Sequence, residues 1–457
     1  MTKNKDKNSL NIPTSDKPRL VIVGGGFGGV HLLKHINMHN FQVVLIDRYN
    51  YHTFQPLLYQ VATAGLEPDS VSEPLRKILK HKKDAYFRML KVIAIDPEAK
   101  QLTTSAGHLD YDYLVLATGA KMNYFGNSDV AENAFPLKQV THALDLRSHI
   151  FQQLEKYEIE PQSDDQDGQL TFVIVGAGPT GVEVTGALLE LKKNIFPVDY
   201  PGIDPEKIKI FLVEGDERVL PAMSEQSANK AQHYLEKMGA KLLLGTMLKS
   251  YDGKTAKFDN DKEITTNTVL WAAGVKPNVP EGFSDKIIEK GRLLVDRFSR
   301  IYADSNEEEV YKNTFAIGDV ALMKTEKYPK GHPGLAQAAI QQAKNVAKNL
   351  NRIQKGKNLK PFSYKNKGVL ATIGRNKAVA DFPNNTRIAG VMGWMLWMIV
   401  HLLFLVGFRN KAIVLANWVW NYFTFDRGIR LILRPSTKTD DSITKEMKFE
   451  MDESLQQ

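Results

Sequence analysis

A glycine pattern that occurs twice constrains the fold of this 457-residue chain more than any other feature. The first copy, RLVIVGGGFGGVHLLKHI, places Gly24, Gly26 and Gly29 between a short apolar run and a helical pattern. Glycines at this spacing permit a tight turn, leave bare backbone for a pyrophosphate, and let a helix pack closely on a strand. A pyrophosphate then lies at the helix N-terminus, where free N–H groups and the helix dipole favour negative charge.

Each copy of the pattern leads to a second apolar strand that ends in an acid. After the first copy, FQVVLID ends at Asp47. The second copy, LTFVIVGAGPTGVEVTGAL, contains Gly176, Gly178 and Gly181, and the following strand IKIFLVE ends at Glu214. A carboxylate at this point accepts hydrogen bonds from a ribose and repels a 2′-phosphate. The sequence therefore predicts two dinucleotide sites and a preference for NAD over NADP.

Three further segments continue the pattern. YDYLVLATGA, with Thr118 and Gly119, and NTVLWAAGVKPN, with Gly274, are each an apolar strand that ends in a turn of small residues. We expect them to be the closing strands of two linked Rossmann-type domains. NTFAIGDVA predicts a strand followed by a turn at Asp319. It resembles the segment of two-dinucleotide flavoproteins whose Asp binds the ribityl chain of the flavin.

Two dinucleotide sites in one chain suggest that one dinucleotide is held and the other exchanges. The economical interpretation is that the first unit holds FAD and that NADH visits the second unit. On this interpretation Thr118, Gly119 and Asp319 join the FAD site, and Gly274 joins the NADH site.

The order of these segments predicts an α/β fold in which an NADH domain is inserted into an FAD domain, followed by a C-terminal membrane-associated helical region. The expected parts are a disordered polar tail at 1–17, the FAD domain at 18–134 and 285–385, the NADH domain at 135–284, a membrane-anchoring region at 386–434, and a disordered tail at 435–457.

The composition restricts the chemistry. The chain contains no cysteine, which excludes a disulfide framework, a thiolate metal site and a cysteine redox pair. A reduced flavin must then pass its electrons directly to oxygen, to a small redox protein or to a quinone. We predict no metal site. The net charge of +8 fits an anionic cofactor, an anionic membrane or nucleic acid. Because no nucleic-acid motif is present and the basic residues are spread along the chain, we expect no nucleic-acid partner.

The segment HPGLAQAAIQQAKNVAKNLN predicts a helix with Gln337, Gln341, Lys344 and Lys348 on one face. Gln342 lies about 100° round the helix from Gln341. An amide can donate to a carbonyl oxygen and accept from a hydroxyl, which suits both a quinone and a quinol. The alternative is a solvated face rich in glutamine.

At this point the chain resembles the type II NADH dehydrogenases, single-subunit and non-pumping NADH:quinone oxidoreductases. AQAAIQQ is similar to the A-Q-x-A-x-Q quinone motif of that family, and NYHTFQPLLYQVATAGL resembles its loop beside the flavin. GAGPTGVEVTGAL is similar to its NADH fingerprint, including Glu183. The resemblance runs from about residue 18 to residue 434. Asp47 is a departure, because many relatives have Glu there.

The resemblance implies that hydride passes from NADH to FAD and that two electrons then pass to a membrane quinone, menaquinone or ubiquinone. It implies that Gln337, Gln341 and Gln342 line the quinone pocket and that Glu183 lies near the nicotinamide. Glu183 is then a candidate proton donor, although an acid in the first turn of a helix is also favoured by the helix dipole. The competing functions are a soluble NADH-dependent reductase of a small electron-transfer protein and a flavoprotein that serves as a scaffold.

An apolar run from 389 to 408 contains one polar side chain, His401, and is long enough to span a bilayer. Two features argue against spanning. Basic residues flank both of its sides, whereas a spanning hairpin concentrates them on one side. An aromatic stripe also recurs at helical spacing, which favours packing on protein; its members are Trp394, Trp397, His401, Phe404 and Phe408.

The segment after the apolar run is amphipathic. Its polar stripe consists of Asn410, Asn417, Asn421, Thr424, Arg427, Arg430 and Arg434. We expect this helix to lie in the membrane interface, with basic residues on anionic headgroups and with Trp418, Trp420 and Phe423 among acyl chains. The prediction is monotopic attachment at the cytoplasmic face of a bacterial inner membrane. A homodimer can coexist with this attachment.

Overall fold

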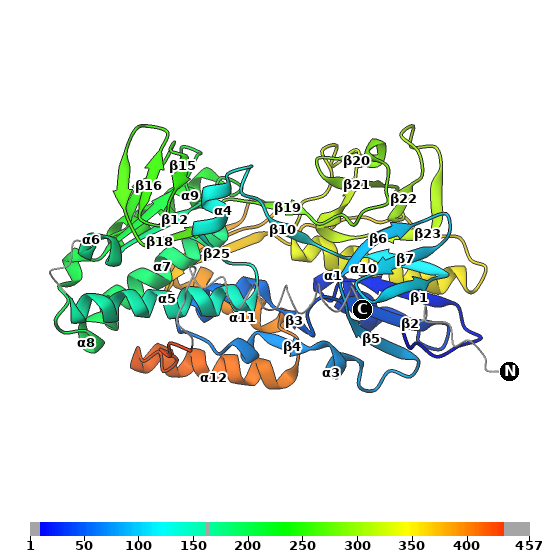
Figure 1. Ribbon diagram of the computed structural model, residues 1–457, viewed down its shortest axis with the longest axis horizontal. Coiled ribbons are helices and arrows are strands. Elements are labelled where there is room, and N and C mark those ends of the chain that lie inside the picture. The colour runs from blue at the N-terminus through cyan, green and yellow to red at the C-terminus, as the bar shows by residue number, and fades with distance from the viewer. Residues whose placement is uncertain (1–9, 161–164, 434–457) are drawn as a thin grey trace, which may run out of the picture. The chain divides into compact units, whose positions relative to one another are not determined.

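The computed structural model describes residues 10–160 and 165–433, which form two compact units (Figure 1). The first unit contains the described residues up to Thr53 together with Ser72–Met122 and Val275–Lys367. The second unit contains Phe54–Val71, Asn123–Gly274 and the described residues from Gly368 onward.

The first unit is built on a mixed sheet with the strand order β20-β21-β22-β23-β9-β1-β2-β5, and β24 pairs with β21. Its central strands β23, β9, β1, β2 and β5 run parallel. Their bounds are β1 Arg19–Val23, β2 Gln42–Asp47, β5 Ala85–Met89, β9 Tyr113–Leu116 and β23 Val310–Ala316. Helix α1 (Phe27–His35) follows β1 and packs against α10 (Ala336–Ile353).

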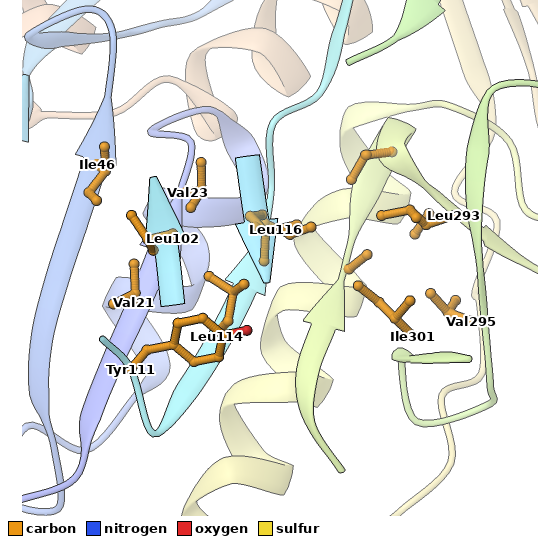
Figure 2. Packing of buried hydrophobic residues seen from close by; sticks show 14 of the residues in the cluster. Val21, Val23, Ile46, Leu102, Tyr111, Leu114, Leu116, Leu293, Val295 and Ile301 are labelled. Atoms are coloured by element: carbon orange, nitrogen blue, oxygen red, sulfur yellow. The ribbon is translucent and has the colours of Figure 1, made fainter. Parts of the chain in front are cut away.

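Both faces of this sheet are buried, which explains why its central strands are continuous apolar runs rather than alternating ones. Val21 and Val23 of β1 belong to one core cluster, whereas Leu20 and Ile22 belong to another. Figure 2 shows the first cluster, in which side chains of β1 and β9 lie in the same core as Leu293 and other residues of the later strands (Figure 2).

The second unit repeats the order of elements found in the first. Its parallel sheet has the order β11-β18-β12-β13-β14. The bounds are β11 Phe135–Pro136, β12 Thr171–Val175, β13 Lys209–Val213, β14 Lys241–Leu243 and β18 Thr268–Trp271, with helices α7 Pro179–Asn194 and α9 Glu225–Met238. In each unit a three-stranded meander precedes the closing strand. The meanders are β6 Val92–Asp96, β7 Gln101–Thr104 and β8 Gly107–Asp110 in the first unit, and β15 Leu248–Tyr251, β16 Thr255–Phe258 and β17 Glu263–Thr265 in the second.

The two expected closing strands are confirmed. β9 pairs with β1, and β18 pairs with β12, each in parallel. The duplication visible in the sequence as two glycine patterns therefore extends to a whole module of strand, helix, two strands, meander and strand.

The chain ends its described part with an antiparallel sheet and two helices in the second unit. The sheet comprises β25 Val369–Gly374, β26 Lys377–Asp381 and β27 Arg387–Ala389. Helix α7 packs on β25, and α11 (Gly390–Phe404) packs on β26. The approach of α7 to β25 is close, because a Cβ on Gly186 would lie 1.8 Å from the carbonyl oxygen of Ile373.

The apolar run from 389 to 408 is not one helix. Helix α11 stops at Phe404, Gly407 takes a positive φ of 88°, and α12 (Phe408–Thr424) begins directly after it. Among the described residues, no helix is long and apolar enough to cross a membrane.

Further elements complete the two units, and they range from a two-residue strand to the 20-residue helix α5. They are β3 Tyr51–Thr53, β4 Ser72–Pro74, α3 Leu75–Leu79, β10 Ala120–Met122, β19 Val275–Pro277, β20 Ile288–Glu289, β21 Arg292–Val295, β22 Arg300–Tyr302 and β24 Ala321–Met323 in the first, and α2 Leu58–Ala62, α4 Ser128–Asn133, α5 Val140–Ile159, α6 Gln166–Gln169 and α8 Phe196–Asp199 in the second.

The units differ from the expected domains in the segment 54–71, at two boundaries, and in residues 368–385. The segment 54–71 belongs to the second unit, where α2 packs against α5. The crossings between units fall at 122/123 and 274/275, because β10 pairs with β19 in the first unit while Asn127 bonds to Lys249 in the second. Residues 368–385 also join the second unit rather than an FAD domain, because β25 packs on α7.

The prediction of a disordered tail at 1–17 is wrong for residues 10–17. Ile12 is only 4% exposed and lies in the core of the first unit, and the side chain of Gln42 donates to the carbonyl oxygen of Pro13. Leu10 and Ile12 make apolar contacts with this core, although most of the residues around them in the sequence are polar. The remainder of that tail and the tail at 435–457 lie outside the described residues.

Candidate functional site

The first glycine pattern forms a loop whose three glycines serve distinct purposes. Gly24 has a φ of 108°, and a Cβ on it would lie 2.3 Å from the carbonyl oxygen of Ala117. A Cβ on Gly29 would lie 1.8 Å from the carbonyl oxygen of Gly24, so this glycine permits the close helix packing. By contrast, a Cβ on Gly26 would meet no described atom within 4 Å. The open space lies at the N-terminus of α1, where a pyrophosphate would bind.

The second pattern repeats this construction in the other unit. Gly176 has a φ of 100° and approaches the backbone of Ala273, and a Cβ on Gly181 would lie 1.8 Å from the carbonyl oxygen of Gly176. Gly178, the counterpart of Gly26, again borders open space at the N-terminus of α7.

Each terminal acid closes its loop in the same way. Asp47 Oδ2 accepts a hydrogen bond of 2.6 Å from the backbone N–H of Gly25, and Glu214 Oε2 accepts one of 2.6 Å from that of Ala177. Burial raises the pKa of Asp47, while its bonds to backbone N–H groups act in the opposite direction. Both carboxylates therefore lie beside the bare backbone of a glycine loop, where the ribose of a dinucleotide fits.

The remaining predicted cofactor residues lie at the carboxyl ends of the same parallel strands. In the first unit, Thr118 and Gly119 follow β9 and Asp319 follows β23, next to the loop after β1. The Thr118 hydroxyl donates to the carbonyl oxygen of Asn278 at 2.6 Å. In the second unit Gly274 follows β18. Ligands of open α/β sheets bind at the carboxyl ends of the strands, so each unit brings its predicted residues to the appropriate edge.

His52 also belongs to the edge of the first unit, and the sequence patterns did not single it out. Its ring is 2% exposed, Nδ1 lies 2.9 Å from the carbonyl oxygen of Gly25, and Phe27 packs edge-on against it. Burial lowers the pKa of His52 to about 4, so the ring is neutral at pH 7. The signal in the sequence was its place in NYHTF, directly after the strand that ends at Asp47.

The three glutamines of α10 have different surroundings. Gln341 both donates to the carbonyl oxygen of Lys365 and accepts from its N–H, and Gln337 accepts from the N–H of Lys367. Both side chains are partly exposed and hold the segment 365–367. Gln342 is 2% exposed, and its Oε1 accepts a 2.7 Å bond from the N–H of Gly318. Through this bond Gln342, which was also predicted to line a quinone pocket, positions the Gly318–Asp319 turn.

Glu183 is a buried carboxyl group in the second unit. It is 7% exposed, its Oε1 accepts a 3.2 Å bond from the indole N–H of Trp397, and the backbone N–H of Thr372 also donates to it. Burial raises the pKa of Glu183 to about 8, so the group is largely protonated at pH 7. The alternative of a solvated acid in the first helical turn is excluded, because α7 begins at Pro179 and Glu183 lies beyond its first turn.

Glu183 borders a cavity of about 110 Å³ within the second unit. Aromatic side chains from three helices line it, among them Tyr59 of α2, Trp397 of α11 and Trp418 of α12. Trp397 packs against both of the others. The sequence identified Trp397 only as part of an aromatic stripe, and it gave no signal that α2 and α12 would meet that stripe.

The outer faces of α11 and α12 are apolar. The exposed large side chains are Val391, Met392, Met395, Ile399 and Leu403 on α11, and Phe408, Leu415, Val419, Trp420, Tyr422 and Phe423 on α12. The opposite face of α11 carries Trp397, which is 2% exposed and stacks on His401.

The polar stripe of α12 points toward the protein, contrary to expectation. Asn410 is 1% exposed, Asn417 donates to Glu67, and Asn421 donates to the carbonyl oxygen of Gly65. Just beyond the helix, Arg427 pairs with Glu190 at 2.7 Å. Asn417, Asn421 and Arg427 therefore have their partners within the unit.

Two expectations for this region are corrected by these contacts. Arg427 and Arg430 form ion pairs with carboxylates of the protein, so they are not held free for headgroups. Trp418 does not face outward, because its indole N–H donates to Gln60 at 2.8 Å and its ring packs on Trp397. Trp420 and Phe423 are exposed as expected. Arg434 lies outside the described residues.

Two family models match this chain, one over the part that contains both glycine patterns and one over the C-terminal sheet and helices. The pyridine nucleotide-disulphide oxidoreductase family matches residues 18–343, and the NDH2 C-terminal domain family matches residues 366–427. The type II NADH:quinone oxidoreductase NdhA of Mycobacterium tuberculosis is 35% identical over 425 residues, which cover 90% of this chain and 88% of that protein. The chain belongs to the type II NADH:quinone oxidoreductase family.

Another member of the type II NADH:quinone oxidoreductase family, from Staphylococcus aureus, is 30% identical over 371 residues, which cover 80% of this chain and 89% of that protein. The solved structure of NDH2 from Plasmodium falciparum in complex with NADH has a TM-score of 0.83 at 22% identity and covers 92% of this chain and all of that one. A sulfide:quinone oxidoreductase from Aquifex aeolicus shares the fold with a TM-score of 0.67 at 21% identity. The family predicted from the sequence is confirmed.

Proposed function

We propose that this protein is a respiratory NADH:quinone oxidoreductase that moves hydride from NADH to FAD and two electrons from FAD to a membrane quinone without pumping protons. The observation that carries the proposal is the pair of matching glycine loops, Gly24–Gly29 and Gly176–Gly181, in a chain without cysteine. We call each loop, together with the acid that bonds to it, a dinucleotide cradle. Two cradles accommodate one held and one exchanging dinucleotide, and the absence of cysteine removes a disulfide as the next acceptor. The relatives named above are quinone oxidoreductases, which supports a quinone as that acceptor.

The first unit would hold FAD, and the second would receive NADH. Bound FAD supplies the hydride acceptor and the path of two electrons to the quinone. Around it, the bare backbone at Gly26 and the N-terminus of α1 bind the pyrophosphate, Asp47 binds the ribose, and Asp319 binds the ribityl chain. In the second unit Gly178 and the N-terminus of α7 bind the pyrophosphate of NADH, and Glu214 binds its ribose.

Quinone binding is assigned to Gln337 and Gln341. Their bonds to the backbone of 365–367 fix the orientation of both amides. The Gln341 amide has two donor hydrogens and two acceptor lone pairs, and its bonds to Lys365 use one of each, which leaves one of each for a quinone oxygen. Glu183 is assigned the role of proton donor to the reduced quinone, because a carboxyl group that is protonated near pH 7 can supply a proton at the working pH. Menaquinone and ubiquinone both satisfy these contacts.

Attachment to a membrane is assigned to the outer faces of α11 and α12. Helix α12 carries its polar stripe inward and its apolar side outward, the reverse of a helix on a water-exposed surface. Lipid would bury such an apolar surface. Because each of the two helices is too short to span a bilayer, we assign them an in-plane attachment. The cytoplasmic leaflet is the side on which NADH is available. A second copy of the chain is the competing occupant of part of this face.

The function is tested by steady-state NADH oxidation with a soluble quinone, with a small electron-transfer protein, and with neither acceptor. Rapid turnover only with quinone is expected. Stopped-flow measurements separate the half-reactions: Gln337→Ala and Gln341→Ala should leave flavin reduction by NADH nearly normal and weaken the quinone half-reaction by a few-fold to about tenfold. Efficient turnover with the protein acceptor and none with quinone would instead support the soluble reductase.

The membrane assignment is tested by replacing Val419, Trp420 and Phe423 together with Ser. Burial of such side chains contributes on the order of 1.5–3 kcal/mol each, so co-sedimentation with vesicles should fall at high salt. Turnover with a water-soluble quinone should persist. The matched control is Trp418→Phe, which alters an inward-facing ring of the same helix and should leave partitioning unchanged. A shift from dimer to monomer with unchanged vesicle binding would assign the face to a second copy.

A further inference from the structure

Helix α7 carries a second acid that shares the cavity of Glu183. Glu183, Ala187, Glu190 and Asn194 are spaced at i, i+4, i+7 and i+11, which places them along one face of a helix. All four line the same cavity of about 110 Å³. The cavity therefore follows α7 for about three turns, and the two carboxyl groups lie about two turns apart along it.

The direct partners of Glu183 cannot pass a proton to it. The indole N–H of Trp397 and the backbone N–H of Thr372 both donate to the carboxylate. Neither group loses its proton at neutral pH, and neither accepts a second one. A proton that leaves Glu183 during turnover must therefore be replaced from the cavity side.

Of the other titratable and charged groups around this cavity, the two arginines, Tyr59 and His401 are unsuitable as proton carriers. The remaining one, Tyr422, contributes a ring that stacks on Trp394. Arg375 and Arg427 stay charged at any physiological pH. Burial raises the pKa of Tyr59 well above its usual range. His401, which stacks on Trp397, has a pKa lowered to about 4 by burial, and its Nδ1 lies 2.7 Å from the carbonyl oxygen of Trp397. Among the described residues that line the cavity, Glu190 is the one other carboxylate.

Glu190 also has the exposure that an entry point needs. Its side chain is 25% exposed, whereas Glu183 is 7% exposed. It is held in place by the ion pair with Arg427 at 2.7 Å and by a 2.5 Å bond from the backbone N–H of Arg375. The cavity between the two acids has room for several water molecules, because one water needs about 10–15 Å³ of such volume. Carboxylate, amide and hydroxyl groups on its walls provide partners for that water.

We propose that Glu190 is the outer station of a proton-entry route, which takes a proton from solvent and passes it through cavity water to Glu183. The inference rests on the proposed function, in which Glu183 supplies a proton to the reduced quinone. The balance requires one such proton per turnover: NADH delivers a hydride, quinone gains two electrons and two protons, and only one of those protons comes from solvent. Glu190 is returned to its charged form after each transfer.

The test uses Glu190→Gln in the full-length enzyme with FAD bound. The substitution keeps the side-chain shape and removes the group that carries the proton. Flavin reduction by NADH should be unchanged, and the quinone half-reaction should slow by about tenfold or more. The deficit should widen as pH rises, and the solvent deuterium isotope effect should increase. Glu190→Asp should restore most of the rate.

A matched control separates proton transfer from loss of the ion pair. Arg427→Gln breaks the same ion pair but leaves the carboxylate of Glu190 in place. It should retain the quinone half-reaction within about twofold and keep the wild-type isotope effect. Equal slowing in both variants, with the same isotope effect, would show that the ion pair matters for structure and would overturn the relay.

A measurement that does not depend on turnover completes the test. The carboxyl band of protonated Glu183, identified by its loss in Glu183→Gln, shifts in infrared spectra when its proton exchanges for deuterium. Transfer into D2O should give slower exchange in Glu190→Gln than in wild type or Arg427→Gln. If Glu183→Gln leaves quinone reduction unchanged, the proposed role of Glu183 fails. If Glu183→Gln slows quinone reduction while Glu190→Gln matches wild type in rate, isotope effect and exchange, the route through Glu190 is wrong.

Discussion

Helices α1 and α7 each carry an ionisable side chain two residues after the third glycine of their pattern, His31 in the first and Glu183 in the second. Burial is the largest cause of the pKa shift at both positions, and it favours the neutral form of each group. It lowers the pKa of His31 to about 3, with Lys34 and Lys344 adding to the effect, and it raises that of Glu183 to about 8.

The difference lies in what each neutral group can do. His31 has no proton to give at pH 7, and its helix packs against α10. Glu183 retains its proton, and it lies beside a cavity and beneath Trp397. The same place in a duplicated module therefore becomes structural in one copy and a potential proton donor in the other, because of the elements that cover it.

The largest effect, a loss of cofactor binding, is expected when the third glycine of either pattern is replaced. A Cβ on Gly29 or Gly181 would lie 1.8 Å from a backbone carbonyl oxygen, so Ala at either position should disrupt its own cradle. Gly29→Ala should yield protein without bound flavin, whereas Gly181→Ala should keep the flavin colour and lose NADH binding. Absorbance spectra and NADH titration distinguish them. Gly428→Ala, at a glycine that lies outside both loops and meets no atom within 4 Å, is the control for folding. Loss of flavin in both glycine variants would show that the two copies are not independent.

The next largest effect is expected at Glu183, whose ionisation should make the free energy of unfolding depend on pH. Because its folded pKa is raised from 4.5 to about 8, folded protein holds a proton that the unfolded chain releases. Stability is therefore lost as pH rises from about 4.5 to about 8, by up to about 5 kcal/mol at 1.4 kcal/mol per unit. Glu183→Gln should remove this dependence and gain stability relative to wild type at pH 9. Urea unfolding at pH 5, 7 and 9 measures it, with surface Glu236→Gln as the control. Parallel curves for wild type and Glu183→Gln would contradict the raised pKa.

A smaller effect is expected from the acid that closes the second cradle. Glu214→Ala should weaken NADH binding by between about tenfold and about a hundredfold, since a hydrogen bond to a charged group contributes roughly 1.5–3 kcal/mol. The preference for NADH over NADPH should become smaller as well, because no carboxylate remains to repel the 2′-phosphate. Glu214→Gln keeps an acceptor for the N–H of Ala177 and so separates loop stability from ribose recognition. Equal use of NADH and NADPH by the wild-type enzyme would contradict this assignment.

The smallest effect is expected at His31, with the opposite dependence on pH. Its folded pKa lies below its unfolded value of 6.5, so stability is lost as pH falls from about 6.5 toward 3. The ring is partly exposed, and solvent screening should reduce the effect to about 1 kcal/mol at pH 5. His31→Asn should be relatively more stable than wild type at pH 5 and unchanged at pH 8. Thermal melts at both pH values measure it, and a gain at pH 8 instead would mean that packing rather than charge is altered.

Much of the fold could be predicted because local chemistry repeats in the sequence. The glycine spacing, the terminal acids and the closing strands each follow from backbone sterics within one module, and all of them lie at the expected strand ends. The helix that carries Gln337 and Gln341 was likewise visible from its periodicity. The burial of Gln342 could not be predicted, because it depends on a bond to the turn at Gly318, which comes from another part of the chain.

The sequence by itself determined the two dinucleotide cradles, since a missing Cβ and a strand-terminal carboxylate act within a few residues. Only the tertiary structure decided which way the polar stripe of α12 faces. A hydropathy pattern defines two sides of a helix but does not say which side meets protein. The carboxylate and carbonyl partners of that stripe at Glu67 and Gly65, more than 300 residues away, settle its direction. Tertiary structure also made Glu183 a buried acid, because Trp397 covers it from a helix more than 200 residues further along the chain.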